Sequence, residues 1–280
     1  MRFGTRCDRI LVENGRVSGL QLAGGERLPA DAVVFNGDAN ALASGLLGPD
    51  AVSAQPRRTP PAQRSLSAVT WAVHARTEGM PLARHNVFFD NDYASEFTDV
   101  MRLRRLPRHG TVYLCAQDRL DGGAGDAPVG AERLLALVNA PADGDHRPLD
   151  ATEIDSCEQR SLNLLKHCGL TLSIEQSRQV QRCTPTDFER LFPGSGGALY
   201  GAATHGWMAL FRRPSASTPL PGLFLAGGSV HPGPGVPMAA MSGRLAAAAV
   251  TAHLDSTHRW RRAATAGGTS TPSATTAATR

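Results

Sequence analysis

The stretch from Gly222 to Ala249, GLFLAGGSVHPGPGVPMAAMSGRLAAAA, constrains the fold more than any other part of the chain. It reads as a short apolar strand, a loop rich in glycine and proline, and an alanine-rich helix. Pro237 suits the first helical turn, because its fixed φ and missing N–H cost little there. A strand, a glycine turn and a helix N-terminus together present backbone N–H groups to an anion or a carbonyl oxygen. The sequence therefore predicts a ligand site at this turn.

The N-terminal residues predict a small antiparallel sheet followed by one buried strand. Runs of alternating polarity from Ile10 to Asp31 are separated by Asn14-Gly15, and an Asn-Gly pair between such runs is a strong hairpin signal. The fully apolar run from Ala32 to Phe35 suits a strand inside a parallel sheet. It ends in the residues NGD, and the three prolines between 55 and 61 then indicate a domain boundary.

The middle of the chain predicts a sheet with helices. Ser65 to Arg76 alternates as one long strand, and one of its faces carries little bulk. That face consists of Ala68, Thr70, Ala72 and His74. It suits a channel for a long ligand, and it equally suits a surface packed beneath a helix. Further strands are expected at 86–89, 111–116 and 133–140, with helices at 93–106, 150–167 and from 184 onward.

The composition excludes several classes of function. Lys and Arg number 29 against 25 Asp and Glu, and aromatic residues make up only 5%, so we expect no nucleic-acid binding. No apolar run approaches the roughly 18 residues of a transmembrane helix, and no secretory leader is recognisable. The nine histidines and five cysteines show neither metal-ligand spacing nor C-x-x-C, which predicts no metal site and reduced thiols in a cytoplasmic protein.

Four stretches of the chain resemble the bacterial carotenoid desaturases, the phytoene-desaturase-like flavoproteins. The most specific is LAGGSVHPGPGVPMAAMSGR from Leu225, which is most similar to the 1-hydroxycarotenoid 3,4-desaturases, also called methoxyneurosporene dehydrogenases. The others are RSLSAVTWAVHARTEGMPLARHNVFF from Arg64, TVYLCAQDR from Thr111, and TPTDFERLFPGSGGALYGAATHGWMALFRRP from Thr184. The resemblance runs from about Arg9 to about His253.

The resemblance implies an α/β flavoprotein of the two-dinucleotide-binding type. Residues 1–50 and 215–260 would form part of a discontinuous FAD-binding domain, and residues 51–214 would form an inserted sheet-and-helix domain that binds substrate. A complete desaturase of this family also has an N-terminal βαβ unit whose G-x-G-x-x-G binds the FAD pyrophosphate. That motif is absent from the sequence, so we expect a C-terminal part of a desaturase. The tail, residues 261–280, is expected to be disordered.

The resemblance also places FAD beside the Gly222–Ala249 stretch. Its two glycines would let the ribityl chain and pyrophosphate pass close to the backbone, or they could simply pack a strand against a helix. The N–H of Met238 or Ala239 would hold the flavin C2 carbonyl. Candidate cofactor-binding residues are Gly227, Gly228, Val236, Pro237, Met238 and Ala239. Ser242 and Gly243 are expected to be small so that the helix packs closely.

The expected substrate channel extends the low-bulk strand. Its candidate residues are Ala68, Thr70, Ala72 and His74, together with Tyr200, His205 and Trp207 in ALYGAATHGWMA. His231 lies between the strand and the helix and could contact cofactor or substrate, although a lone loop histidine is more often structural. It is the weak catalytic candidate, and no residue pattern identifies a general base.

The resemblance implies an FAD-dependent oxidoreductase of carotenoid biosynthesis. It would remove two hydrogens across the C3–C4 bond of an acyclic hydroxylated carotenoid. One alternative is a non-catalytic binding half that needs a partner chain to supply the pyrophosphate motif, and another is a different enzyme of the flavin amine-oxidase type. Because a carotenoid comes from lipid, peripheral attachment at the cytoplasmic face of the inner or photosynthetic membrane is expected. The segment Met101–Arg108, MRLRRLPR, suits either an anionic lipid surface or a solvated helix end.

Overall fold

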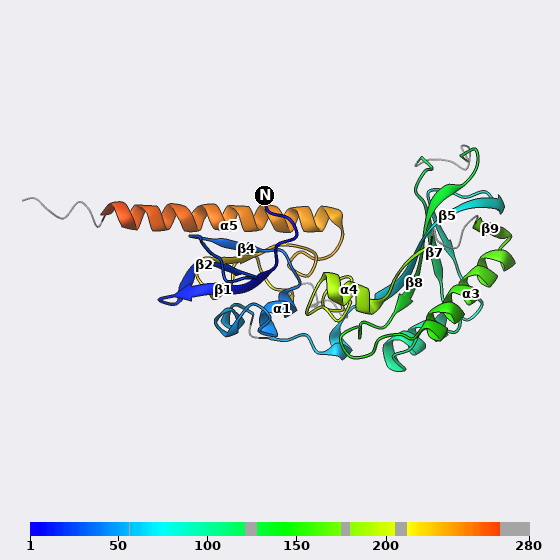
Figure 1. Cartoon of the computed structure of the whole chain (residues 1–280), viewed down its shortest axis with the longest axis horizontal. Helices are drawn as coiled ribbons and strands as arrows, with labels where there is room; N and C mark the ends of the chain where they lie inside the picture. Colours follow the sequence, from blue (N-terminus) through cyan, green and yellow to red (C-terminus); the bar gives the residue numbers. More distant parts are fainter. Residues whose placement is uncertain (56, 121–127, 175–179, 205–211, 264–280) are drawn as a thin grey trace, which may run out of the picture.

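The computed structural model describes residues 1–55, 57–120, 128–174, 180–204 and 212–263, with the side chains of 258–263 excepted. Figure 1 shows two lobes side by side along the long axis of the molecule. Residues from both ends of the chain build the first lobe, and residues from the middle build the second. The two predicted channel residues His205 and Trp207, and the tail from 264 onward, lie outside the described residues.

The first lobe contains two small sheets and the longest helix. Strands β1 (Cys7–Glu13), β2 (Arg16–Leu22) and β3 (Arg27–Pro29) form an antiparallel meander. Strands β4 (Val33–Phe35) and β11 (Leu223–Leu225) form a separate parallel pair. The remaining elements are α1 (Ala39–Ala43), the 3₁₀ helices η1 (Pro49–Ala54) and η2 (Pro61–Gln63), and α5 (Val236–Ala263).

The predicted hairpin at Asn14-Gly15 is confirmed. Both residues have positive φ, +52° at Asn14 and +73° at Gly15, and Glu13 pairs with Arg16 across the turn. Positive φ at both central positions defines the two-residue turn whose twist matches that of the flanking strands. Apolar side chains of β1 and β2, including Ile10 and Val17, then pack with Leu223 and Leu225 in the core of this lobe.

The second lobe is a six-stranded antiparallel sheet with one long helix. The order is β10-β5-β8-β7-β6, and β9 pairs with the far half of β5. The strands are β5 (Ser67–Gly79), β6 (His85–Phe88), β7 (Val112–Ala116), β8 (Glu132–Ala140), β9 (Leu170–Ile174) and β10 (Gln181–Cys183). The helices are α2 (Tyr93–Phe97), a π-helical turn η3 (Thr98–Arg102), α3 (Ala151–His167) and α4 (Pro185–Leu191).

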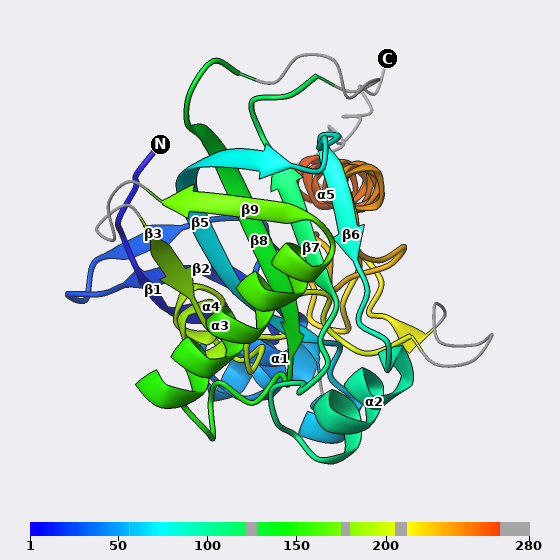
Figure 2. The same cartoon turned by 90° about the vertical axis from the view of Figure 1, so that its right-hand side faces the viewer.

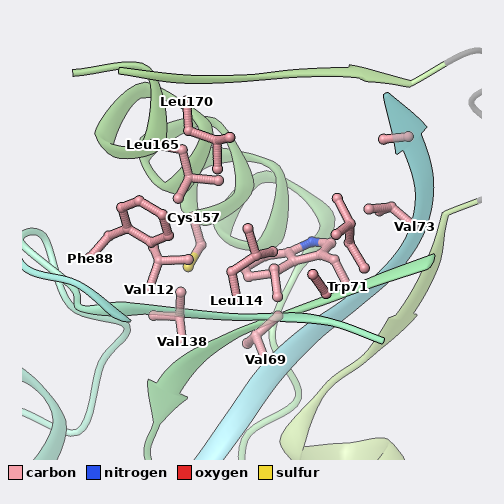
Figure 3. Close-up of a cluster of buried hydrophobic side chains, with 14 of the residues drawn as sticks. Val69, Trp71, Val73, Phe88, Val112, Leu114, Val138, Cys157, Leu165 and Leu170 are labelled. Carbon is pink, nitrogen blue, oxygen red and sulfur yellow. The ribbon is translucent and has the colours of Figure 1, made fainter. Parts of the chain in front are cut away.

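Helix α3 covers one face of this sheet. It opens with a capping box, in which the Asp150 carboxylate accepts from the Glu153 N–H and the Glu153 carboxylate accepts from the N-cap N–H. Figure 3 shows Cys157 and Leu165 from this helix pointing into a cluster with Trp71 and Leu114 from the strands. In Figure 2 the sheet is seen from the α3 side, with α5 end-on beside it.

The opposite face of the sheet is buried at Ala68 and Thr70, near the start of β5, and exposed from Ala72 onward. Cross-strand pairing joins Thr70 to Leu137 and Tyr113 to Leu137, so these side chains share that face. Leu137 and Tyr113 are half-buried, and Val87, paired with Tyr113, is exposed. In Figure 1, α3 lies on the side of the sheet away from α5, so the uncovered face is on the side of the N-terminal end of α5.

The predicted helix 93–106 is shorter than expected. It is regular only from Tyr93 to Phe97, continues as the π-helical turn to Arg102, and stops where Arg104 adopts a φ of +53°. A left-handed backbone at a non-glycine residue cannot continue a right-handed helix. Within the described ranges, no helix has both the length and the apolar character needed to cross a bilayer, and no group of His, Cys, Asp and Glu could hold a metal ion.

Candidate functional site

The carboxyl ends of the two parallel strands meet in the first lobe. Val33 to Phe35 pair in register with Leu223 to Leu225, and the Ala226 N–H donates to the Phe35 carbonyl at 3.1 Å. The loop at residues 36–38 therefore lies against the loop at residues 226–229. Ligands of open α/β sheets bind at this edge, because loops that diverge from adjacent strand ends leave a crevice.

The glycine pair has two different environments. Gly227 has a φ of +119°, and a Cβ there would lie 2.7 Å from Asn36 Oδ1, so only glycine fits. Its N–H donates to the Ser242 hydroxyl of α5 at 3.1 Å. A Cβ on Gly228 would meet only Pro234 Cα, at an ordinary 3.7 Å. Packing therefore requires Gly227, whereas the free space at Gly228 leaves its backbone open to a ligand.

The beginning of α5 agrees with the sequence in part. The helix starts at Val236, and Pro237 stands in its first turn as predicted. The Ala239 N–H donates to the Gly235 carbonyl at 2.8 Å and is not available to a flavin, so this candidate donor was wrong. The Met238 N–H has no hydrogen-bond partner within the described chain. One donor of the predicted pair therefore remains at the positive end of a 28-residue helix.

The prediction of close packing at the two small helix residues was only half right. Ser242 is fully buried and uses its hydroxyl as the acceptor for Gly227. A Cβ on Gly243 would meet nothing within 4 Å outside the backbone of its own helix, so close packing does not explain that glycine. The serine is needed for its oxygen as much as for its size.

Arg213 fastens the glycine loop to the second lobe. Its guanidinium Nη1 donates to the carbonyls of Gly228 at 3.1 Å and Tyr200 at 3.0 Å, and Nη2 donates to Ala202 at 3.0 Å. The side chain is 6% exposed and its Nε has no partner in the described structure. Burial lowers the pKa of Arg213, and the nearby Asp38 carboxylate acts in the opposite sense.

A cavity of about 680 Å³ opens beside these loops. Its lining mixes polar and apolar surface about equally, and its side chains carry more positive than negative charge. Its lining residues are Asp38, Ala39, Asn40, Gln55, Arg57, Arg58, Thr59, Ala62, Gln63, Gly201, Ala202, Ala203, Arg212, Arg213, Pro214 and Ser229. The volume falls in the range of roughly 300–1,000 Å³ typical of small-molecule sites.

Asp38 is the acidic side chain of this cavity. It caps α1, where its Oδ1 accepts from the Asn40 N–H at 2.8 Å. The next residue, Ala39, donates its N–H to the Ser229 hydroxyl at 3.2 Å, which fixes the capped helix against the glycine loop. Burial raises the pKa of the Asp38 carboxyl above its ordinary value, although the Asn40 N–H and the positive charge of Arg64 oppose that rise.

The residues predicted to line the channel occupy three places. Ala68 and Thr70 are buried, whereas Ala72 and His74 are exposed on the uncovered face of the second-lobe sheet. Helix α3 covers the opposite face, whereas the short helix α4 contacts β5, so the channel and the surface packed beneath a helix both stay predictions for this face. Tyr200 is exposed beside the cavity, with its carbonyl bound by Arg213.

Similarity to known proteins identifies the family of this chain. Residues 1–251 match the family of flavin-containing amine oxidoreductases. The chain belongs to this family. Membership indicates a flavin cofactor and the mixed α/β, flavin amine-oxidase-like fold, and the relatives below confirm the resemblance to carotenoid desaturases.

Several carotenoid enzymes are similar to this member of the family. A hydroxyneurosporene desaturase of Rubrivivax gelatinosus is 65% identical over 98% of this chain and 52% of its own length. A hydroxyneurosporene desaturase of Cereibacter sphaeroides is 44% identical over 92% of this chain and 50% of its own length. A 1-hydroxycarotenoid 3,4-desaturase of Flavobacterium is 29% identical over 88% of this chain and 49% of its own length. The chain thus spans about half the length of the curated relatives it matches.

Among solved structures, an oxidoreductase from Methanosarcina mazei superposes with a TM-score of 0.47 at 20% identity, over 85% of this chain and 47% of the other. This likeness is too slight to support an argument about the site. The residues themselves fit a flavin, because the open backbone at Gly228 and the unpaired Met238 N–H stand at the strand ends where such a ligand binds.

Sequence reasoning missed two residues of this flavoprotein site. Asp38 closes the NGD that follows an apolar strand, and a carboxylate at a strand end was the signal that could have identified it. Arg213 offers no local signal, because its three acceptors come from segments that meet only in the folded chain. The weak candidate His231 is not among the described residues that line the cavity, and its backbone N–H donates to the Pro214 carbonyl at 2.8 Å.

The predicted lipid-binding segment is partly occupied by internal contacts. Leu106 is buried and so is not available to a lipid surface, and Arg105 pairs with the buried Asp99 at 2.6 Å. Arg104 donates to the Ala142 carbonyl at 3.1 Å. Leu103 remains exposed, next to an aromatic series that the sequence did not single out. Its rings belong to Phe89, Tyr93 and Phe97, all exposed and stacked edge to face at 5.4 and 5.1 Å.

Proposed function

We propose that this chain carries the substrate and flavin-facing part of an FAD-dependent desaturase. It would remove two hydrogens across the C3–C4 bond of an acyclic hydroxylated carotenoid, in carotenoid biosynthesis. The observation that supports this most is the junction of two unlike surfaces. A cavity rich in charged and amide side chains lies at the ends of β4 and β11, and β5, which starts at Ser67 shortly after the cavity residue Gln63, leads from it to the sheet face that is exposed from Ala72 onward.

This junction fits a substrate with one polar end. In a 1-hydroxycarotenoid the hydroxyl group is two carbons from C3, so the polar end and the reacting carbons must lie together. The cavity offers the side chains of Gln63 and Thr59 as hydrogen-bonding groups for that hydroxyl, whereas the Asn40 amide is already bonded to Gly194 and to the Thr59 N–H. The conjugated chain would extend along the sheet face past Ala72 and Leu137, where burial of apolar surface favours it.

The chemistry asks the protein mainly for orientation. One hydrogen leaves as a hydride, for which a bound FAD supplies the acceptor, and the other leaves the neighbouring carbon as a proton while its electron pair forms the C=C bond. Arg213 holds the Gly228 carbonyl, and Ser242 holds the Gly227 N–H, so the loop that would face the flavin is fixed in advance. A fixed loop keeps the reacting groups in line and lowers the entropy cost of reaching the transition state.

The first test is whether the chain holds the cofactor. Purified chain is mixed with FAD, desalted, and its absorbance spectrum is recorded before and after dithionite. We expect a retained flavin band that bleaches on reduction. The matched variant is Gly228→Val, whose branched side chain fills the open space by the loop, and it should release the flavin. A wild-type spectrum without flavin would contradict cofactor binding by this chain alone.

A second candidate function is that of a binding half that needs another chain. Two parallel strands alone form an incomplete sheet, because such sheets are normally covered on both faces and contain more strands. Met241 and Leu245 are 45% and 44% exposed on one side of α5, next to Met238. A unit carrying the missing phosphate-binding motif would cover them.

That candidate is tested by mixing the chain with the part of the Rubrivivax relative that it does not match. Under this candidate, stable FAD binding appears only in the mixture, and Met241→Glu with Leu245→Glu abolishes it. Ala247→Glu is the matched control, because helical spacing puts Ala247 on the exposed face with Arg244 and Thr251 instead. Equal flavin retention with and without the added part would remove the candidate.

We also propose peripheral attachment to the cytoplasmic face of the inner or photosynthetic membrane. The exposed rings of Phe89, Tyr93 and Phe97 support it, because aromatic side chains favour the bilayer interface. Exposed Arg102 and Arg108 nearby would favour anionic headgroups. Arg104 and Arg105 do not contribute, since both make internal contacts.

A further inference from the structure

Among the described residues that line the cavity, one side chain can act as a base at neutral pH. Among the described residues that line it, Asp38 is the sole carboxylate, and the lining includes no histidine, lysine, tyrosine or cysteine. The remaining polar groups are arginines, amides and hydroxyls, which are not bases under these conditions. A desaturation whose reacting carbons lie in this cavity has Asp38 as its available base.

The Asp38 carboxylate is held in place but not neutralised by an ion pair. Its Oδ1 accepts from the Asn40 N–H at 2.8 Å, and the described chain gives no other hydrogen bond to this carboxylate. Three charged groups face it from other segments, and each is engaged elsewhere. Arg64 is bidentate to Asp145 at 2.7 Å, Arg213 binds backbone carbonyls, and Glu189 accepts from the N–H groups of Gly194 and Gly196.

Within the described chain, the second carboxylate oxygen of Asp38 therefore accepts no hydrogen bond. Because Ala39 is bonded to Ser229, the capped turn cannot drift from the glycine loop where the flavin would lie. A carboxylate fixed at the strand ends next to a cofactor loop is in position to reach a substrate carbon presented to that cofactor. Burial also raises the pKa of Asp38, which makes the carboxylate a stronger base than an exposed aspartate.

We propose that Asp38 is the proton acceptor of the desaturation, an inference that rests on the proposed function. The carboxylate takes the proton from one carbon and becomes a carboxylic acid, and the electron pair of that C–H bond becomes the π bond. A bound flavin would supply the acceptor for the hydride that leaves the neighbouring carbon. The acid then returns its proton to water through the cavity.

The central variant is Asp38→Asn. Asparagine caps a helix as well as aspartate does, so this change keeps the Asn40 contact and removes only the base. We expect anaerobic reduction of bound flavin by a 1-hydroxycarotenoid to slow by about 10²–10⁴-fold, the usual share of a general base. Asp50→Asn, an exposed aspartate on η1 outside the cavity, is the matched control and should react as the wild type.

Chemical rescue separates a base from a merely structural aspartate. Asp38→Gly costs little as a cap and leaves space in the cavity. Added formate should restore part of its rate, whereas formate should not accelerate the wild type or Asp38→Asn. As the pH drops, the wild-type rate should fall as one group becomes protonated. This acidic limb of the pH–rate profile should be absent in Asp38→Asn. If Asp38→Asn reacted as fast as the wild type, the role of Asp38 as proton acceptor would be overturned, whereas the proposed function would stand.

A measurement without cofactor or turnover provides an independent check. Carbon-13 carboxyl NMR of the wild-type chain, with Asp38→Asn to assign the signal, should show Asp38 titrating above the ordinary aspartate value of about 3.9. Titration at or below that value would overturn the proposal. If the wild-type chain held flavin but the carotenoid never reduced that flavin, the proposed function would be contradicted. Asp38 would then have no carotenoid substrate from which to take a proton.

Discussion

The Arg213 guanidinium donates to the carbonyl oxygen of Gly228 at 3.1 Å, and this bond joins the glycine loop of the first lobe to the segment leading to the second. The same nitrogen also donates to Tyr200 at 3.0 Å. A planar fork with several donors can serve backbone groups that point in different directions, which a lysine cannot do. The glycine loop is therefore fixed by contacts within the chain itself.

Replacing Arg213 should destabilise the chain. Arg213→Met removes the donors of three part-buried carbonyls, and we expect the free energy of unfolding to fall by about 2–4 kcal/mol. Urea denaturation measures it. Arg212→Met is the matched control, because the exposed neighbour makes no such bonds and should change stability by less than about 0.5 kcal/mol. Equal losses in the two variants would refute the fastening role of Arg213.

The buried pair Arg119–Glu132 should make stability depend on acid pH. Their side chains are 5% and 2% exposed, with Nη2 to Oε1 at 2.6 Å. Hydrogen bonds from Arg119 hold the pKa of Glu132 below its ordinary value. The pair therefore stabilises the fold fully above the unfolded pKa of glutamate, about 4.3, and less as pH falls through the lower folded pKa.

The test compares unfolding of wild type and Glu132→Gln from pH 7 to pH 3. At pH 7 the variant should lose about 3–5 kcal/mol, because Arg119 is left buried and unpaired. The difference between the two proteins should shrink toward pH 3. Replacing both residues, as Arg119→Met with Glu132→Leu, should recover part of the loss. A difference that is constant across this pH range would contradict the assignment.

The two faces of the second-lobe sheet should respond differently to truncation. Leu114 is fully buried against α3, so Leu114→Ala should lower the free energy of unfolding by about 2–5 kcal/mol. Leu137 is half-buried on the uncovered face, and Leu137→Ala should cost less than about 1.5 kcal/mol. The second variant should instead weaken carotenoid binding, measured as the shift in the carotenoid spectrum on titration. Unchanged binding would argue against the sheet face as the polyene site.

The aromatic series should govern attachment to lipid. Phe89→Ser with Phe97→Ser removes two of three exposed rings, and sedimentation with vesicles containing anionic lipid should fall severalfold. Phe192→Ser is the control, since Phe192 is comparably exposed after α4 and outside the series. Equal sedimentation of all three proteins would exclude this surface from membrane contact.

Local signals predicted the local structure of this chain well. The Asn14-Gly15 hairpin, the capping box at Asp150 and the helix start at Pro237 each depend on a few adjacent residues, and the structure contains all three. The helix from Tyr93 failed where tertiary contacts intervened, because Asp99 inside it is drawn to Arg105 and to the Arg108 N–H. Propensity describes a segment in isolation and carries no information on such contacts.

The candidate site could be predicted only where it is contiguous in sequence. Gly227, Gly228 and Met238 lie in one stretch with a recognisable strand–turn–helix pattern. Asp38 joins them through the parallel pairing of β4 with β11, which brings together residues nearly 190 positions apart, as the Ala39–Ser229 bond shows. No local pattern encodes that pairing, so the sequence could flag Asp38 as a carboxylate at a strand end, but its place in a cavity beside the glycine loop became visible only in the folded chain.

The most direct test of the account is anaerobic mixing of the flavin-loaded chain with a 1-hydroxycarotenoid while both chromophores are followed. The account predicts that the flavin band bleaches as the carotenoid absorption moves to longer wavelength, since each new double bond extends the conjugation. It also predicts that both changes occur at the same rate. A flavin that stays oxidised beside an unchanged carotenoid spectrum would contradict it.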